Sequence, residues 1–451
     1  MKPLIYLLIG ASFFSSFRDL INVLGPLGKL FTFVPEVLAA LLLASVMLEL
    51  GRRKQLALSP KYMLLAILLL SHVLIGIALN TVPAGTVAGG MRLYFKFMPV
   101  FLAPCVVPYS EREIQNLLKF ILFLCLLQAP VALLQRVFVF SQQETGDVVR
   151  GTFGVGSILS ITLVSIIVAL VGFYQRNRLS KKQLALLAPT LFLPTMINET
   201  KGTIVLLPIA MFGLAMLNAK PGHAMKNLLL GSLLTLAFIG TFAAAYRVFF
   251  PGNLENDMGV LEFLFEGAAA DAYYKDKGPG EGKTIGRWDS VVFAYDILLA
   301  DPTRLLAGLG IGNVSDPSTS SIIRGAYSEE FFEYGVDITT ISYLIWEVGL
   351  IGVAITFMMI GAIFWDAKAL SRQDTLVGAL GLAWAAILTM MPAAMLYKDL
   401  IHHAQIGFLA ALVSGIIVSA RYRQLATEKQ RILYAVGTPL RSGGAGMDPN
   451  S

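Results

Sequence analysis

The sequence predicts an all-α integral membrane protein with about twelve transmembrane helices. Of its 451 residues, 56% are hydrophobic and only 14% are charged, whereas a soluble domain carries about 25% charged residues. The mean hydropathy is +0.70, and apolar runs long enough to cross a hydrocarbon core of about 30 Å recur along most of the chain. The clusters of lysine and arginine all fall on one side of such an arrangement.

The apolar runs divide the chain into four parts. Residues 1–248 form a first membrane bundle, residues 249–338 a long loop, residues 339–420 the last spans, and residues 421–451 a basic tail that we expect to be disordered. The predicted spans are 3–24, 29–50, 61–80, 91–108, 114–138, 156–175, 184–197, 202–219, 227–248, 339–366, 375–395 and 401–420.

The distribution of lysine and arginine predicts the orientation in the membrane. Basic clusters at 52–54, 176–182, 220–226 and 421–431 all lie on one side of a twelve-helix bundle, which the positive-inside rule makes the cytoplasmic side. Both termini are then cytoplasmic, and the loop 249–338, with 15 acidic and 6 basic residues, lies outside. We expect a bacterial inner-membrane protein, and the acidic loop accounts for the uneven charge without a nucleic-acid partner.

Neither the cysteines nor the histidines form a metal or disulfide pattern. Cys105 and Cys125 lie within apolar runs, and no pair among the four histidines has zinc-site spacing. No cofactor is therefore expected.

Three features mark the long loop as more than a connector. Apolar residues at the spacing of one helix face predict an amphipathic helix that lies on the membrane surface or caps the bundle; they are Trp288, Val291, Val292, Tyr295, Leu298 and Leu299. The run Gly308-Leu-Gly310-Ile-Gly312 predicts a tight turn whose amides face outward, toward a phosphate, rather than a dinucleotide site, because no βαβ unit surrounds it. Residues 328–334 combine acids with aromatic rings, which suits either a sugar or a solvated face.

Several cations lie in or beside the predicted spans, where charge is costly and indicates function. Arg92 and Lys96 are four residues apart and so share a helix face. Together with five further cations, named at the end of this paragraph, Arg92 and Lys96 predict a pocket for a lipid diphosphate. Guanidinium groups bind phosphate oxygens bidentately. Snorkelling at the interface or pairing with local acids is the alternative interpretation. The other members of the set are Arg136, Arg150, Lys201, Arg287 and Lys398.

Four segments, in this order, resemble the O-antigen ligase and polymerase superfamily of bacterial membrane enzymes. They are Arg150-Gly-Thr-Phe-Gly154, Glu199-Thr-Lys201-Gly202, Gly286-Arg287-Trp288 with the glycine run at 308–312, and Glu347-Val-Gly-Leu-Ile-Gly352. The second segment has lysine where the family has arginine. The resemblance covers residues from about 90 to 415 and implies a GT-C-like membrane fold.

One departure from the family concerns a histidine. Its ligases carry a histidine about nine residues before the glutamate that corresponds to Glu347, and here Asp337-Ile338 takes that place. This favours a polymerase, whose acceptor is a second lipid-linked repeat unit. Either Asp337 or Glu347 would then accept the acceptor's proton, although Asp337 is equally suited to cap the next helix.

The resemblance implies an inverting, metal-independent glycosyl transfer that polymerises repeat units linked to undecaprenyl diphosphate, for an O-antigen, capsule or exopolysaccharide. Arg287 and Arg150, helped by Lys201 or Arg92, would hold the diphosphate, and Gly310 and Gly312 would shape the turn beside it. A chain-length regulator or a flippase of the same pathway is the implied protein partner.

Three other functions stay open. A ligase would transfer the glycan to lipid A-core or to protein. A transporter or flippase of a lipid-linked sugar would show two related halves, which are not visible here. A non-catalytic partner in a secretion complex is the third.

Overall fold

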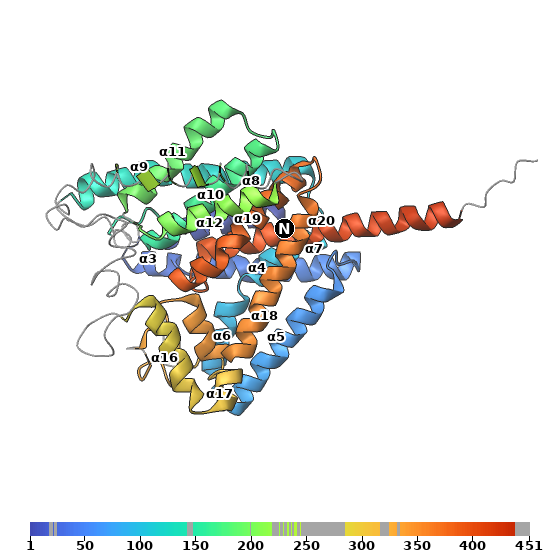
Figure 1. Cartoon of the computed structure of the whole chain (residues 1–451). Coiled ribbons are helices and arrows are strands. Elements are labelled where there is room, and N and C mark those ends of the chain that lie inside the picture. The colour runs from blue at the N-terminus through green and yellow to red at the C-terminus, as the bar shows by residue number, and fades with distance from the viewer. Residues whose placement is uncertain are drawn as a thin grey trace, which may run out of the picture.

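The computed structural model is helical throughout the part of the chain that it describes (Figure 1). It describes residues 1–17, 25–141, 148–198, 200–218, 285–315, 324–331 and 334–437, with Ile21 and scattered positions between 225 and 244. The predicted span 227–248, the front of the long loop and the last residues of the tail fall mainly or wholly outside these ranges.

Seven of the described helices are long and apolar enough to cross a membrane, so the chain is an α-helical membrane protein. The total of twelve spans stays a prediction. The seven are α4 (Val34–Arg53), α5 (Pro60–Leu79), α8 to η1 (Glu111–Val139), α10 (Gly156–Gln175), α18 (Thr340–Leu370), α19 (Leu376–Tyr397) and the membrane part of α20 (Ala404–Arg431). Shorter helices include α1 (Lys2–Phe14), α3 (Pro26–Phe31), α11 (Lys181–Ile197), α12 (Thr203–Leu217), α16 (Arg287–Leu299) and α17 (Pro302–Ala307).

Three predicted elements differ from the structure. The span expected at 91–108 is two helices, α6 (Ala84–Phe95) and α7 (Met98–Val106). Pro99, which has no N–H to donate, lies in the first turn of the second helix. The first helix ends at Phe14 rather than at 24. Residues 421–437, expected to be disordered, continue α20 and are supported by side-chain hydrogen bonds from Arg421 to Gln424 and from Gln424 to Glu428.

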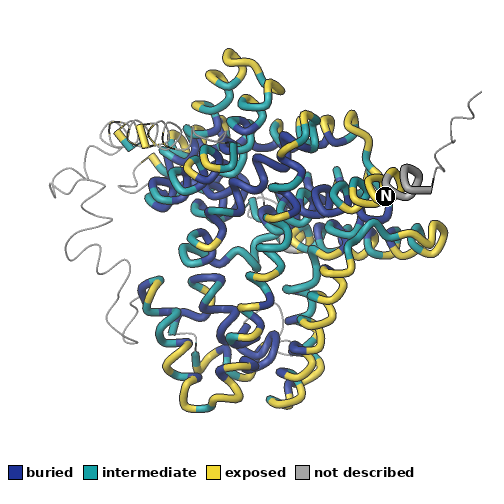
Figure 2. The backbone as a smooth tube through the Cα atoms, turned by 45° about the vertical axis from the view of Figure 1, so that its right-hand side comes forward, coloured by how far each residue is buried: buried dark blue, intermediate teal, exposed yellow. Residues whose placement is uncertain are grey.

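The buried centre of the bundle lies around α10 and α19 (Figure 2). Lipid tails are as apolar as leucine, so helices in a membrane associate through close packing of small residues. A Cβ atom at Gly172 would lie 3.1 Å from the Cβ atom of Ala383, which shows how closely α10 and α19 approach. Gly213 of α12 packs in the same way on Thr389 of α19.

Helix α18 is broken at Gly349, and the break positions the long loop. Gly349 has φ 62° and ψ −174° inside the helix, a conformation open mainly to glycine. Its Cα faces the backbone of Leu306 and Gly308, so that a side chain would overlap them. Helices α16 and α17 therefore dock on α18, which runs beside α5 (Figure 1).

The helix predicted in the loop is present as α16, but the predicted apolar face is wrong, because only Leu298 of that face is buried. Ser290, Ala294 and Leu298 are buried, and the carbonyl of Ser290 accepts a hydrogen bond of 2.9 Å from the Ser342 hydroxyl of α18. Trp288 and Tyr295 stay exposed. The helix thus caps the bundle and turns Trp288 and Tyr295 outward.

The cap of α18 is Thr339 rather than Asp337. The Thr339 hydroxyl oxygen accepts a hydrogen bond from the N–H of Ser342 at 3.0 Å, and the helix begins at Thr340. Asp337 lies two residues earlier and is exposed. The prediction that Asp337 caps this helix is therefore wrong.

Replacing Gly349 by alanine should destabilise the fold. A residue other than glycine at this φ costs about 1–3 kcal/mol, and the new methyl group would also overlap the backbone of residues 306–308. We expect a lower midpoint of thermal unfolding in detergent. The control is Gly361→Ala in the same helix, where the methyl group meets open space; equal midpoints for both variants would contradict this account of the break.

Candidate functional site

A polar cavity of about 430 Å³ lies among α1, α4, α6, the turn before α10 and the start of α20. Its charged and polar wall is formed by Ser15, Ser16, Thr32, Glu36, Arg92, Lys96, Ser315, His402, His403 and Gln405. The turn contributes Phe153, Gly154 and Val155. A cavity of this size, closed in by apolar helices and lined by a few convergent polar groups, is the expected form of a small-ligand site.

Arg92 and Lys96 both line this cavity, which confirms that they share a helix face. The Arg92 guanidinium donates to the Glu36 carboxylate at 3.0 Å, and the Lys96 ammonium donates to the backbone carbonyl of His402 at 3.4 Å. Each cation also lies over an aromatic ring, Phe33 and Phe97 respectively. Two cations are thus held at the cavity wall, and one carboxylate, Glu36, pairs with Arg92.

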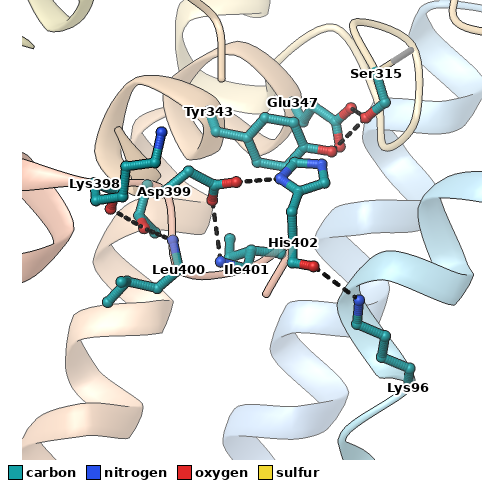
Figure 3. A network of polar contacts seen from close by, with 10 residues as sticks. Lys96, Ser315, Tyr343, Glu347, Lys398, Asp399, Leu400, Ile401 and His402 are labelled. Carbon is teal, nitrogen blue, oxygen red and sulfur yellow. Dashed lines mark hydrogen bonds and ion pairs between the residues drawn. The ribbon is translucent and has the colours of Figure 1, made fainter. Parts of the chain in front are cut away.

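The segment 398–403 between α19 and α20 brings an acid and two histidines to the same wall. The buried Asp399 carboxylate pairs with the imidazole of His402 (Figure 3). The His402 ring packs edge-on against the Tyr343 ring of α18, with centroids 4.6 Å apart. His403 lines the cavity, and among the described residues its ring has no hydrogen-bond partner.

Backbone hydrogen bonds hold this segment against the start of α18. The N–H of Asp399 donates to the Ile338 carbonyl at 3.1 Å. The Thr340 hydroxyl donates to the Lys398 carbonyl at 3.1 Å and accepts from the N–H of Leu400 at 2.8 Å. The position of His402 is therefore tied to the end of the long loop.

The two histidines have opposite electrostatic surroundings. Burial disfavours the imidazolium of His402, but the Asp399 carboxylate outweighs it and raises the pKa of His402 above 6.5. Burial likewise opposes the charge on Asp399, yet His402 and His403 hold its pKa below the usual value. At His403 burial prevails and lowers the pKa to about 4. The Asp399 carboxylate thus favours the imidazolium form of His402, whereas His403 is a neutral imidazole at pH 7.

Glu347, a predicted catalytic residue, lies one hydrogen bond behind the cavity wall. It is fully buried, and its carboxylate accepts from the Ser315 hydroxyl at 2.7 Å, while that hydroxyl also pairs with Tyr343 (Figure 3). Ser315 lines the cavity and Glu347 does not. Asp337, the other predicted base, is exposed and outside the cavity lining.

The glycine run forms the predicted tight turn, but its amides face inward. Gly308, Gly310 and Gly312 all have positive φ. The N–H groups of Leu309 and Gly310 donate to the carbonyls of Trp346 and Glu347 at 2.8 and 3.0 Å. A side chain at Gly312 would overlap the backbone of α6 at Gly90. The glycines allow the loop, α6 and α18 to approach one another closely. The prediction that the amides face outward is wrong for the N–H groups of Leu309 and Gly310.

The remaining predicted cations lie outside the cavity lining. Arg287 donates to the Tyr397 carbonyl at 2.9 Å and stacks on its ring at 4.8 Å. Gly202, next to Lys201, packs on the same ring. Two of the segments that resemble the O-antigen superfamily thus meet at Tyr397, directly before the segment 398–403. The N–H of Arg150 donates to the Gln135 side chain. Arg150 lies in the turn before α10, and Phe153, Gly154 and Val155 of the same turn line the cavity.

The sequence interpretation missed Glu36, Asp399, His402, His403 and Gln405. The signal that was available is Lys398-Asp-Leu-Ile-His-His403, a polar and titratable run between two apolar spans on the predicted outer side. Among the described residues, no three His, Cys, Asp or Glu side chains gather as metal ligands.

Comparison with known protein families gave no matching family model, and comparison with curated proteins gave no match. The resemblance to the O-antigen superfamily therefore remains a prediction.

The Asp399–His402 pair should make stability depend on pH. Folding raises the pKa of His402, so the protonated ring stabilises the folded state. This stabilisation is complete below the pKa of the unfolded state, near 6.5, and is lost as the pH rises through the pKa of the folded state. The lowered pKa of Asp399 contributes stability that is lost only as the pH falls through its folded value. His402→Gln leaves the buried Asp399 carboxylate without its partner, so it should cost about 3–5 kcal/mol near pH 6 and less at pH 9.

Thermal unfolding in detergent at both pH values measures this difference. The control is Arg372→Gln, a change at an exposed residue on the connection between α18 and α19, which should follow the wild-type pH dependence. A cost for His402→Gln that is constant or grows toward pH 9 would show that the pair is not ionised as described.

Proposed function

We propose that the protein transfers a glycan from undecaprenyl diphosphate to a hydroxyl acceptor at the outer face of the membrane, and that it polymerises lipid-linked repeat units. The observation that carries this proposal is the cavity wall, on which Arg92 and Lys96 place two cations beside the imidazoles of His402 and His403. Asp399 favours the charged form of His402, and His403 is neutral at pH 7. A diphosphate leaving group needs that charge, and the acceptor hydroxyl needs a proton acceptor.

The cations would bind the diphosphate and stabilise the charge that grows as it leaves. Hydrogen bonds to charged groups contribute about 1.5–3 kcal/mol each, and they strengthen where helices exclude water. Glu36 pairs with Arg92 and so limits the repulsion among the cations. A bound diphosphate would compete with Glu36 for the guanidinium.

His403 would accept the proton of the acceptor hydroxyl. The hydroxyl oxygen forms the new bond to the anomeric carbon as the bond to the diphosphate oxygen breaks, and the electron pair of that bond leaves with the diphosphate. His403 lines the same cavity as the cations and is neutral at pH 7, which a general base requires. Arg287, which donates to the Tyr397 carbonyl, and Gly202, which packs on the Tyr397 ring, would position this segment.

A ligase remains the second candidate, and the histidine segment favours it. The loop lacks the histidine of the family's ligases, but His402 reaches the Tyr343 ring four residues before Glu347 from another part of the chain. The imidazole of His402 therefore lies near the start of α18, where the long loop has Asp337-Ile338 in place of the family's histidine. Purified protein given lipid-linked repeat units alone separates the two functions, since only a polymerase makes a ladder without a further acceptor.

Removing either cavity cation should slow glycan transfer. Lys96→Ala and Arg92→Ala should each lower kcat/KM about 10- to 100-fold, the loss of one hydrogen bond to a charged phosphate oxygen. The measurement is polymer formation by purified protein in lipid nanodiscs from a synthetic lipid-linked repeat unit. Arg372→Ala removes an exposed cation away from the cavity and should retain wild-type rates. Wild-type rates for both cavity variants, at equal amounts of folded protein, would refute the proposed function.

A further inference from the structure

Helix α16 has a second apolar face, away from the one that packs on α18. Its buried side holds Ser290, Ala294 and Leu298. The other side is a stripe of apolar residues at positions i, i+4, i+7 and i+11, which fall on one face of a helix. No residue of this stripe is buried, and the largest, Trp288, is 54% exposed. We call these four residues the outer stripe: Trp288, Val292, Tyr295 and Leu299.

The acidic residues of α16 lie outside the outer stripe. Asp289 and Asp296 are seven residues apart and so share a face, which is turned away from the stripe along the helix surface. Asp296 is exposed. The helix therefore has three sides: one buried against the protein, one apolar and exposed, and one acidic.

Helix α17 ties α16 to the C-terminal end of α5. A Cβ atom at Gly76 of α5 would lie 3.0 Å from the Ala307 carbonyl oxygen. The Asn80 side chain donates to the Gly308 carbonyl at 3.0 Å. Figure 1 shows α16 and α17 near this end of α5 and away from the projecting end of α20. The end of α17 thus lies at the depth of the last turn of a helix that is long and apolar enough to cross the membrane.

The exposed side of α5 is the surface that such a helix presents to lipid. Ile75 and Leu79, in the last two turns of α5, are each 53% exposed. Leu306 of α17, next to this end of α5, is 46% exposed. Exposed apolar surface of this extent marks a site of contact with a membrane or a protein. Because the outer stripe and Leu306 adjoin the apolar side of α5, they extend a lipid-facing surface.

We propose that the outer stripe lies in the lipid of the leaflet on the loop's side of the membrane, so that α16 is held between the bundle and the bilayer. Trp288 and Tyr295 are residue types that favour this depth, because each has an apolar ring and one polar group that can reach the headgroups. The acidic side of α16 would remain in water. This inference concerns how the loop is held, and it does not rest on the proposed function.

Tryptophan fluorescence in lipid nanodiscs tests where the outer stripe lies. The full-length protein would be reconstituted in phosphatidylcholine and in phosphatidylcholine brominated near the headgroup end of its acyl chains, since bromine quenches only rings that reach it. The chain has four tryptophans, so the difference between the wild type and Trp288→Phe isolates the emission of Trp288. A helix in the interface lies about 5–10 Å into the boundary between headgroups and acyl chains, so we expect the bromines to remove at least about half of this emission. Aqueous iodide should remove little of it.

Cysteine labelling supplies an independent measurement on the same face. Leu299→Cys places a thiol in the outer stripe, and Glu330→Cys places one at an exposed, charged position of the long loop. The native Cys105 and Cys125 are buried, so they should contribute little background. Maleimides react with the thiolate, so a membrane-impermeant maleimide should label Leu299→Cys in nanodiscs at least about 10-fold more slowly than Glu330→Cys. In sodium dodecyl sulfate both variants should be labelled at the same rate.

Either of two other outcomes would overturn the inference. Labelling of Leu299→Cys as fast as that of Glu330→Cys would show that the outer stripe faces water. Slow labelling without bromine quenching of Trp288 would show that protein, such as a second copy of this chain, covers the stripe instead of lipid. Trp288 and Leu299 are both exposed, so the variants should fold as the wild type does.

Discussion

The ion pair between Asp399 and His402 is the interaction on which the site depends. A buried carboxylate is costly unless it is paired, and Asp399 is buried with His402 as its partner. The backbone of this short segment bonds to Ile338 and Thr340, and its His402 carbonyl accepts from Lys96. The connection between α19 and α20 thus contacts the end of the long loop and α6, and it lines the cavity.

Glycines supply the second constraint, because they let backbones meet without side chains between them. Gly349 breaks α18 where the loop docks, and Gly312 packs against Gly90 of α6. This contact positions Ser315 at the cavity wall, and the Ser315 hydroxyl donates to Glu347, which lies outside the cavity lining. The family-like glycine run therefore builds the site through packing, and the cations of other segments supply the charge.

Local patterns in the sequence were enough to predict the helical class, the shared face of Arg92 and Lys96, the loop helix and the tight glycine turn, because each depends on residues close in the chain. The approach of Lys96 to His402 joins residues 306 positions apart, and no periodicity encodes such a contact. The cap of α18 was missed because Asp337 and Thr339 are both capable caps, and only the backbone decides between them.

The account's central claim is that this cavity moves a glycan from a lipid diphosphate, and the lipid-linked intermediate that accumulates in a deletion strain tests it most directly. Lipid extracts from the deleted and the complemented strain would be compared by mass spectrometry. The account predicts a single repeat unit on undecaprenyl diphosphate, removed by the wild-type gene. A polymer on the carrier would indicate the ligase instead. Identical lipid-linked pools in both strains would contradict glycan transfer altogether.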